Sequence, residues 1–407
     1  MKVLHTSDWH LGRMLYGQKR HDEFESFLSW LTVFIQHQQI DVLIVAGDVF
    51  DTTTPGNRVQ ELYFQFLSRI RSTSCRHVIV TAGNHDSPTL LNAPKELLRY
   101  LNIHITGEIT DSPADEVITL FDADNQPEAI VCAVPFLRDK DVRKVDEGEN
   151  SQDKTQNLMN GIASHYYHVG EHANELLQQY GDIPVLAMGH LFTKGGTTLE
   201  GDGTRDLYVG TAVKVGADIF PACFDYVALG HLHSAQLVGG KENIRYSGSP
   251  LPMGFNEANQ QKKVIVVEFE GKKLNITEHN VPVFMPLIRI SGNLEQIVAQ
   301  IRSSKEKYTD AYLEIECTES ELHSDLTEQV TMETEDSALK VLRLKNKQIE
   351  NQVLARAHET EELEDLDPKE VFERCMLTHT LEEDLKVSLR NCYLEILATI
   401  ETEENLH

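Results

Sequence analysis

Residues 2–10 read KVLHTSDWH, a short apolar strand followed by Asp8 and His10. The same construction, an apolar run, one or two small residues and then side chains that bind metal, returns four times along the chain. The later stretches are VLIVAGD ending at Asp48, VIVTAGNHD with Asn84 and His85, VLAMGH ending at His190, and YVALGHLH with His231 and His233. Because strand ends meet at one edge of an α/β fold, the pattern predicts a single site built from five distant segments.

The candidate ligands combine carboxylates, imidazoles and one side-chain amide oxygen. This mixture favours a pair of divalent transition metals over a closed thiolate zinc site. Each motif alone says little, because Asp48 could cap a helix, Asn84 could hold a turn, and an isolated histidine is usually structural. Five motifs in this order instead indicate the hydrolysis of phosphate esters.

The composition is that of an ordinary globular protein. The 407 residues are 41% hydrophobic and 25% charged, which predicts one large domain and one or two smaller units. Six scattered cysteines without a Cys-x-x-Cys pair fit reduced thiols. No apolar run approaches the ~20 residues of a membrane span, and a cleaved leader would remove Asp8 and His10. We therefore expect a cytoplasmic protein that does not bind membranes.

The net charge of −27 argues at first against a nucleic-acid substrate, since Lys and Arg usually contact the phosphates. The acidic residues are, however, unevenly distributed. Residues 286–407 hold 28 acidic and 13 basic side chains, more than half of the excess. Two divalent ions would also add positive charge where a phosphate must bind, and this local field outweighs the total charge.

Apolar runs alternate with helical patterns from the first strand to about Val281, as in a layered α/β domain. Spacings of three to four residues predict helices over 24–35 and 59–70. The charged stretch 139–156 is predicted to be a segment at the surface that connects two strands, a surface excursion of the chain. The two apolar runs around Gly271 predict a hairpin.

A small α/β unit is predicted after Pro286, with the order strand, helix, strand, helix, strand. Its elements are 287–290, 294–301, 311–316, 322–330 and 340–344. A further helix is predicted from Asp367, where Pro368 takes the first helical position and Glu370 completes a capping box. Its apolar stripe, residues 381–400, fits packing on its own domain and docking to a partner helix equally well.

The order Asp-x-His, Gly-Asp, Gly-Asn-His-Asp, Gly-His and Gly-His-x-His resembles the calcineurin-like metallophosphoesterase superfamily. This resemblance implies an α/β (α+β) fold in which helices flank a β-sandwich. Within the superfamily, the stretches HTSDWHLG, VAGDVFD, AGNHDS, GHLHSAQ and YSGSPLPMGFNE are similar to bacterial DNA nuclease subunits. The specific motifs extend to about residue 257, and the remaining chain resembles that branch mainly in its layout.

The resemblance implies two ion sites that share the Asp48 carboxylate. The ligands of one ion are Asp8, His10, Asp48 and His233, and those of the other ion are Asp48, Asn84, His190 and His231. Two ions roughly 3.5–4 Å apart can activate a water and bind phosphate oxygens. The resemblance implies Mn²⁺, although mixed nitrogen and oxygen ligands also accept Mg²⁺ or Fe²⁺.

His85 follows the ligand Asn84, and the resemblance gives it a catalytic role without metal contact. We expect it to protonate the leaving sugar oxygen or to stabilise the transition state, with Asp86 or Asp51 as orienting partner. Asp51 stands where related archaeal and eukaryotic nucleases carry histidine. A relay through a histidine pair is therefore in doubt, and Asp51 is the alternative catalytic partner.

The implied activity is that of a 3′–5′ exonuclease on double-stranded DNA and an endonuclease on single strands and hairpins, in DNA end processing, recombination and repair. The implied partner is an SMC-like ATPase with a coiled coil, in a heterotetramer built on a homodimer associated with the nucleoid. Residues 57–72 or 88–101 are the two candidates for the dimer surface. The implied domains are a nuclease domain (1–285), a capping domain (286–345), and an acidic linker with partner-binding helices (346–407).

Two alternatives remain. One is another phosphoesterase of the superfamily, acting on small nucleotides or phosphoproteins. Protein phosphatases of the superfamily place Arg-Gly soon after the second motif, whereas Thr52 follows Asp51 here. The other alternative is a scaffold protein without catalysis, which predicts missing ligands, and all seven proposed ligands are present.

Overall fold

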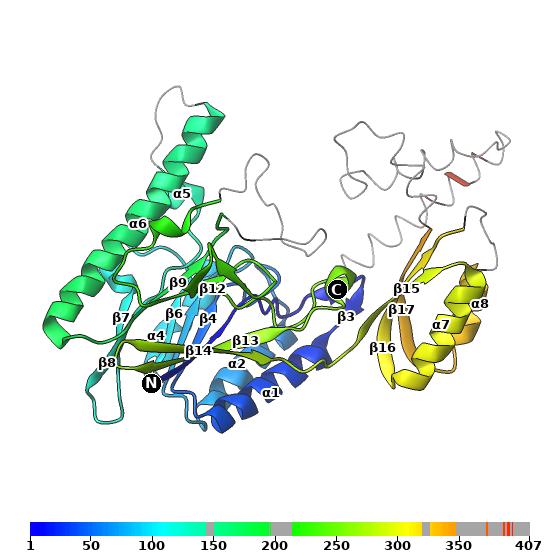
Figure 1. The fold of residues 1–407 in the computed structure, drawn as a ribbon, viewed down its shortest axis with the longest axis horizontal. Coiled ribbons are helices and arrows are strands. Elements are labelled where there is room, and N and C mark those ends of the chain that lie inside the picture. Colours follow the sequence, from blue (N-terminus) through cyan, green and yellow to red (C-terminus); the bar gives the residue numbers. More distant parts are fainter. Residues whose placement is uncertain are drawn as a thin grey trace. The chain divides into compact units, whose positions relative to one another are not determined.

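The computed structural model describes residues 1–143, 150–194, 196, 214–319 and 326–346, with the single residues Phe372, Lys386, Leu389, Arg390 and Tyr393. The chain divides into two units, Met1–Met285 and Pro286–His407. Figure 1 shows their secondary structure. In the described part of the chain, no helix combines the length and the apolar character needed to cross a membrane.

The first unit contains a mixed six-stranded sheet whose order is β14-β13-β1-β4-β5-β6. Its strands are β1 (Lys2–Thr6), β4 (Val42–Ala46), β5 (His77–Thr81), β6 (Ile103–Thr106), β13 (Lys263–Glu270) and β14 (Lys273–Asn280). Strands β1, β4, β5 and β6 are parallel, and the antiparallel hairpin β13–β14 pairs with β1. The predicted hairpin around Gly271 is confirmed.

A second six-stranded sheet has the order β11-β12-β10-β9-β8-β7. Its strands are β7 (Val117–Phe121), β8 (Pro127–Cys132), β9 (Val185–His190), β10 (Tyr226–Gly230), β11 (Gln236–Val238) and β12 (Lys241–Tyr246). The four central strands are parallel, and the two edge strands are antiparallel to their neighbours.

The two sheets pack face to face because their strands are apolar on both sides. In β1, Val3 lies in the core between the sheets, and the next residue, Leu4, packs under helices on the outer face. Helices α1 (His21–Gln38) and α2 (Asn57–Ile70) cover that outer face of the first sheet, and α6 (Ser151–Tyr180) covers the second sheet. The predicted β-sandwich flanked by helices is therefore confirmed.

Shorter elements complete the first unit. They are β2 (Met14–Leu15), β3 (Gln18–Lys19), α3 (Pro88–Asn92), α4 (Lys95–Arg99), α5 (Asp139–Val142) and 3₁₀ helices at Pro113–Glu116, Ala217–Ile219 and Phe255–Glu257. The helices predicted over 24–35 and 59–70 are confirmed as α1 and α2. The stretch 139–156 lies between β8 and β9, and 152–154 are exposed, as predicted for a surface excursion. It is helical in two places: α5 lies at Asp139–Val142, and α6 begins at Ser151 after a capping box formed by Asn150 and Asp153.

The second unit contains a parallel three-stranded sheet, β15-β16-β17, with two helices packed on it. Its elements are β15 (Leu287–Gly292), α7 (Leu294–Lys307), β16 (Asp310–Cys317), α8 (Leu326–Thr334) and β17 (Ala338–Asn346). The predicted order of strand, helix, strand, helix and strand is confirmed. The helix predicted from Asp367, with its apolar stripe over 381–400, lies outside the described residues except for isolated positions such as Phe372 and Tyr393, whose rings stack.

Candidate metal centre

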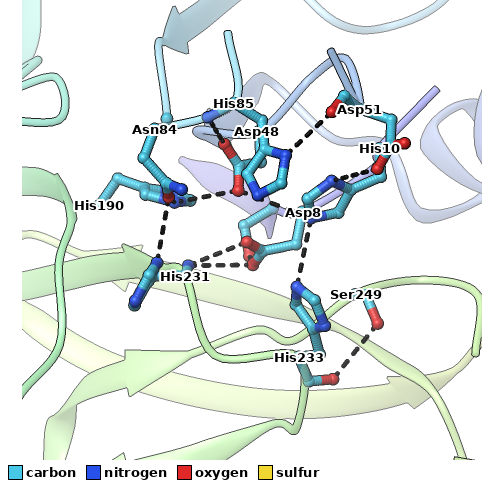
Figure 2. A network of polar contacts seen from close by, with 12 residues as sticks. Asp8, His10, Asp48, Asp51, Asn84, His85, His190, His231, His233 and Ser249 are labelled. Carbon is cyan, nitrogen blue, oxygen red and sulfur yellow. Dashed lines mark hydrogen bonds and ion pairs between the residues drawn. The ribbon is translucent and has the colours of Figure 1, made fainter. Parts of the chain in front are cut away.

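The polar residues of the five motifs meet at the carboxyl ends of β1, β4 and β5 in one sheet and of β9 and β10 in the other (Figure 2). Main-chain hydrogen bonds join the first two loops, since Asp8 N donates to Gly47 O and His10 N donates to Asp48 O, both at 3.0 Å. The second sheet is tied to the first by His190 Nδ1, which lies 3.0 Å from Ala46 O. The site therefore depends on the packing of both sheets.

One group of donor atoms surrounds His10. Its Nε2 lies 3.2 Å from His233 Nε2 and 3.5 Å from Asp48 Oδ2. Asp8 completes the group, because its donor atom and those of His10 and His233 all lie within 4.8 Å of one another. The side chains of this group are buried.

A second group surrounds Asn84 and shares the same carboxylate oxygen. His190 Nε2 lies 3.0 Å from Asn84 Oδ1 and 3.2 Å from Asp48 Oδ2. His231 Nδ1 lies 3.2 Å from Asn84 Oδ1. Asp48 Oδ2 is thus placed between both groups.

These separations fit metal coordination. Donors bound at about 2.1 Å to one ion lie about 3.0 Å apart at right angles and about 3.4 Å apart at the tetrahedral angle. The measured donor separations of 3.0–3.5 Å match this range. Imidazole nitrogens, carboxylates and an amide oxygen also suit divalent transition metals. The residues present therefore fit a pair of divalent ions.

The backbone at this edge adopts unusual conformations. Four non-glycine residues at the proposed ligand positions have positive φ angles: Asp8 (52°), His10 (45°), Asp48 (50°) and His231 (104°). Such conformations cost roughly 1–2 kcal/mol per residue and cluster at functional sites, where the surrounding structure enforces them. The strained backbone conformations thus direct these side chains toward the site.

Glycines allow the close approach of the loops. A Cβ at Gly47 would lie 2.2 Å from His190 Nδ1, and one at Gly83 would lie 2.1 Å from Asp48 Oδ1. A Cβ at Gly230 would lie 1.9 Å from Ala46 O, on the opposite sheet. The glycines directly before Asp48, Asn84 and His231 are therefore a steric requirement of the site.

The charges of the cluster favour a cation. Burial, together with the nearby Asp48 carboxylate, raises the pKa of Asp8 to about 6. Burial acts in the same direction on Asp48, yet the His190 and His10 imidazoles hold its pKa well below the usual value. Burial tends to lower the pKa of His190, but Asp48 and Asp8 raise it to about 9. Asp48 is thus ionised and attracts the protonated imidazole of His190. A divalent ion bound at the same place could replace that positive charge.

His85 lies beside the donor groups, where its ring packs edge-on to His10 with centroids 4.8 Å apart. Its Nδ1 lies 2.9 Å from the main-chain oxygen of Asp51. The carboxylate of Asp51 has other partners, with Oδ1 3.3 Å from His10 Nδ1 and 3.1 Å from Arg13 Nη1. A carboxylate oxygen of Asp51 also lies within 4.8 Å of a ring nitrogen of His85. Asp51 thus contacts His85 through its backbone and His10 through its side chain.

The Asp86 carboxylate binds the backbone of two loops and not the side chain of His85. Its carboxylate accepts hydrogen bonds from the backbone amides of Val49 (3.1 Å), Phe50 (2.9 Å) and Gly83 (2.8 Å). It therefore locks the loop after β4 to the loop after β5. Of the two orienting partners expected for His85, Asp51 contacts the ring through its main-chain oxygen, and Asp86 has no contact with the ring among the described hydrogen bonds.

Other histidines and basic residues have different positions. His5 is buried between the sheets, 3.0 Å from Tyr226 Oη and 3.2 Å from Leu229 O. The place of Arg13, Lys19 and Arg20 after the first motif suggests either contacts with DNA phosphates or a solvated surface. Arg20 fits neither, because it is only 2% exposed and binds Glu23 and the main-chain oxygen of Pro252. Neither His5 nor Arg20 is placed among the candidate ligands.

Sequence reasoning missed several residues that support the site. Ser7 Oγ donates to Asp8 and lies 2.8 Å from Ser247 Oγ. Lys262 and Ser249 both contact the main-chain oxygen of His233. The stretch YSGSPLPMGFNE could have indicated Ser247 and Ser249, although it contains no recognisable metal-ligand motif; Ser7 and Lys262 lie outside it.

Comparisons with known families agree with this geometry. The model described as "Calcineurin-like phosphoesterase" matches residues 1–235, and the model described as "Type 5 capsule protein repressor C-terminal domain" matches residues 283–380. The first match covers all the proposed ligands. A β-glucosidase from Thermotoga maritima, 10% identical with 84% of this chain and 83% of that chain covered, superposes with a TM-score of 0.21, too low to indicate a shared fold.

Curated relatives are similar over longer stretches, in one case over almost the whole chain. The SbcD component of the nuclease SbcCD from Escherichia coli K12 is 35% identical over 408 residues, 99% of each chain. Proteins of the same name from Rhodobacter capsulatus and Bacillus subtilis are 34% and 33% identical, over 67% and 66% of each chain respectively. The chain therefore belongs to the calcineurin-like phosphoesterase family, in the branch of the SbcD nucleases.

Proposed function

We propose that the protein is a two-metal DNA nuclease. The observation that carries this proposal is the position of Asp48 Oδ2, 3.5 Å from His10 Nε2 in one donor group and 3.2 Å from His190 Nε2 in the other. A carboxylate shared in this way suits a pair of ions, the arrangement used by many phosphodiesterases. The family supports phosphate-ester chemistry, and the relatives named as nucleases support DNA as the substrate.

Each donor group would hold one ion. The first comprises Asp8, His10, Asp48 and His233, and the second comprises Asp48, Asn84, His190 and His231. A divalent pair bound here would supply Lewis-acid activation of water and neutralisation of the phosphate charge. We propose Mn²⁺ for both positions because the family resemblance implies it; the donor set, which combines nitrogen and oxygen and contains no thiolate, is compatible with Mn²⁺ and also with Mg²⁺ or Fe²⁺.

The chain's own contribution to catalysis is centred on His85. Donation from its Nδ1 to Asp51 O, at 2.9 Å, fixes the ring and makes Nε2 the nitrogen that meets the substrate. His85 N also donates to Asp48 Oδ1 at 2.9 Å, so its position follows that of the shared carboxylate. We assign His85 to the leaving oxygen of the scissile phosphodiester, as proton donor or hydrogen-bond donor.

The test is cleavage of labelled duplex and hairpin DNA with Mn²⁺. We expect 3′–5′ degradation of duplex ends and opening of hairpins, and we expect Asp48→Asn to abolish both. The matched control is Asp111→Asn, which makes the same change on an exposed residue and should leave cleavage intact. Wild-type protein that cleaves neither DNA nor a model phosphodiester with Mn²⁺, Mg²⁺ or Fe²⁺ would refute the function.

We further propose that the chain works with an SbcC-type ATPase. The supporting fact is that the relatives bear the name of one component of a complex and match 99% of this chain in the longest case. We assign residues 1–285 to the nuclease domain, 286–345 to a capping domain, and 346–407 to an acidic linker and helices that bind the ATPase coiled coil. Removal of the residues after Asp367 should abolish ATPase binding and spare Mn²⁺ binding.

The assembly is proposed to contain a homodimer of this chain within a heterotetramer. Of the two candidate surfaces, residues 88–101 are favoured, because Leu97 and Tyr100 are 69% and 87% exposed. Sedimentation of Leu97→Asp should show a monomer where the wild type is a dimer. Val33→Asp, on a 56% exposed residue of α1, is the matched control and should remain dimeric.

A further inference from the structure

The segment Ser247–Lys262 follows β12 and leads into β13, and none of its residues is a proposed metal ligand. It nevertheless carries buried polar side chains beside the site. Ser247, Ser249 and Glu257 have no exposed surface, and Lys262 is 6% exposed. Buried polar groups are costly unless they make defined contacts, so their partners indicate what the segment does.

Lys262 and Glu257 form a buried ion pair, with Nζ 2.5 Å from Oε2. The same Glu257 oxygen accepts a hydrogen bond from Met253 N at 2.9 Å. Because a buried pair often stabilises a protein no more than apolar residues of the same size, stability alone does not explain it. Its position beside a proposed ligand is a better explanation.

Both members of the pair reach His233. Lys262 Nζ donates to His233 O at 3.1 Å, and Ser249 N donates to the same oxygen at 3.1 Å (Figure 2 shows Ser249 beside this oxygen). Glu257 Oε1 lies 3.9 Å from His233 Nδ1, where its charge acts on the ring without a direct hydrogen bond. Lys262 and Ser249 thus hold the backbone of His233, and Glu257 places a negative charge near its imidazole.

The segment also reaches a second proposed ligand. Ser247 Oγ lies 2.8 Å from Ser7 Oγ, and Ser7 Oγ donates to Asp8 Oδ2. Asp8 and His233 belong to the same donor group. In the other group, the His190 ring contacts Ala46 O, in β4. Asp8, however, also lies near Asp48 and His190 and accepts hydrogen bonds from His231 N, so the serine contact touches both halves of the centre. The Glu257–Lys262 pair contacts His233, a member of the first group.

We propose that the buried Glu257–Lys262 pair is a positioning element that sets the cation affinity of the donor group formed by Asp8, His10, Asp48 and His233. The inference rests on the proposed two-metal function. Lys262 fixes the main chain of His233, and the Glu257 charge near the distal imidazole nitrogen favours the tautomer whose other nitrogen faces the ion. Loss of groups that orient a metal ligand typically weakens metal binding 10–100-fold. The group around Asn84 keeps its affinity.

The test is calorimetric titration of chelator-treated, full-length protein with Mn²⁺. Wild type should show two binding events. Glu257→Gln should weaken one event about 10–100-fold and leave the other within about twofold. Glu268→Gln is the matched control, because it makes the same change in a solvent-accessible pair with Lys2, and it should leave both events unchanged.

A second variant separates positioning from folding. Glu257→Met combined with Lys262→Met leaves no lone buried charge, so it should melt near the wild-type temperature while one binding event stays weak. Recovery of both events in this double variant would show that the pair acts only through stability and would overturn the inference. Equal weakening of both events in Glu257→Gln, or no weakening, would also overturn it.

The DNA assay distinguishes this inference from the proposed function. Wild-type protein that binds two Mn²⁺ ions but cleaves no DNA would refute the nuclease, and selective weakening in Glu257→Gln would still support the positioning role. Normal cleavage by the wild type with an unchanged titration of Glu257→Gln would refute the positioning role and leave the nuclease standing.

Discussion

Gly83→Ala should damage the centre without changing any proposed ligand. The added Cβ would lie 2.1 Å from Asp48 Oδ1, 2.4 Å from Asp48 N and 2.6 Å from Asp48 Cγ. Real Cβ contacts are essentially never shorter than 3.0 Å, so the carboxylate must move by about 0.9 Å. The hydrogen bond from His85 N to Asp48 Oδ1, now 2.9 Å, depends on the same atom.

The magnitude follows from this displacement. A misplacement of about 1 Å can cost about 100-fold in rate, and overpacking of a core costs about 1–3 kcal/mol in the free energy of unfolding. We therefore expect turnover of a model phosphodiester with Mn²⁺ to fall about 100-fold, while thermal unfolding remains cooperative. Mn²⁺ affinity should fall for both ions, because Asp48 Oδ2 belongs to both donor groups.

Gly56→Ala is the control, because a Cβ at Gly56 meets nothing within 4 Å. Its φ of −62° is also accessible to alanine. This variant should keep wild-type turnover and Mn²⁺ affinity. Gly83→Ala protein with unchanged Mn²⁺ affinity and turnover would refute the close packing of Gly83 on Asp48 and the shared use of that carboxylate.

Three further outcomes are expected. His85→Ala should bind Mn²⁺ as the wild type does but lose about 10²–10⁴-fold in turnover, and loss of the metal in calorimetry would contradict its assignment to the leaving group. Asp51→Asn should weaken one Mn²⁺ event about 10–100-fold, because its carboxylate lies 3.3 Å from His10 Nδ1; an unchanged isotherm would speak against this contact. Arg20→Met should lower the free energy of unfolding by about 3 kcal/mol in denaturant titration, because Glu23 then stays buried without its partner. DNA affinity should not change. Weaker DNA binding without loss of stability would indicate that Arg20 contacts DNA.

The arrangement of the candidate site could be predicted from the sequence to an unusual extent. Each motif joins an apolar strand to a polar residue through a small residue, and this local pattern fixes where the side chain emerges. The steric need for Gly47, Gly83 and Gly230 shows why the pattern is so regular. The same short sequence pattern therefore predicts both the end of the strand and the position of the ligand.

Other features were not predictable because they depend on contacts distant in sequence. The direction of the Asp51 carboxylate is set by His10 and Arg13, which belong to another loop. The role of Lys262 depends on a main-chain oxygen 29 residues earlier. Helix α6 was missed at its start because its first turns are polar, and its burial begins only near Ile162.

The strained backbone of the ligand loops links the amount of folded protein to cation supply. The four left-handed residues are Asp8, His10, Asp48 and His231. A cation present at 100 times its dissociation constant stabilises the native state by about 2.7 kcal/mol, roughly the cost of two such residues. Starvation for the metal would thus enlarge the unfolded population that proteases degrade. The cellular amount of the protein, and not only its catalytic rate, would then depend on the supply of the metal.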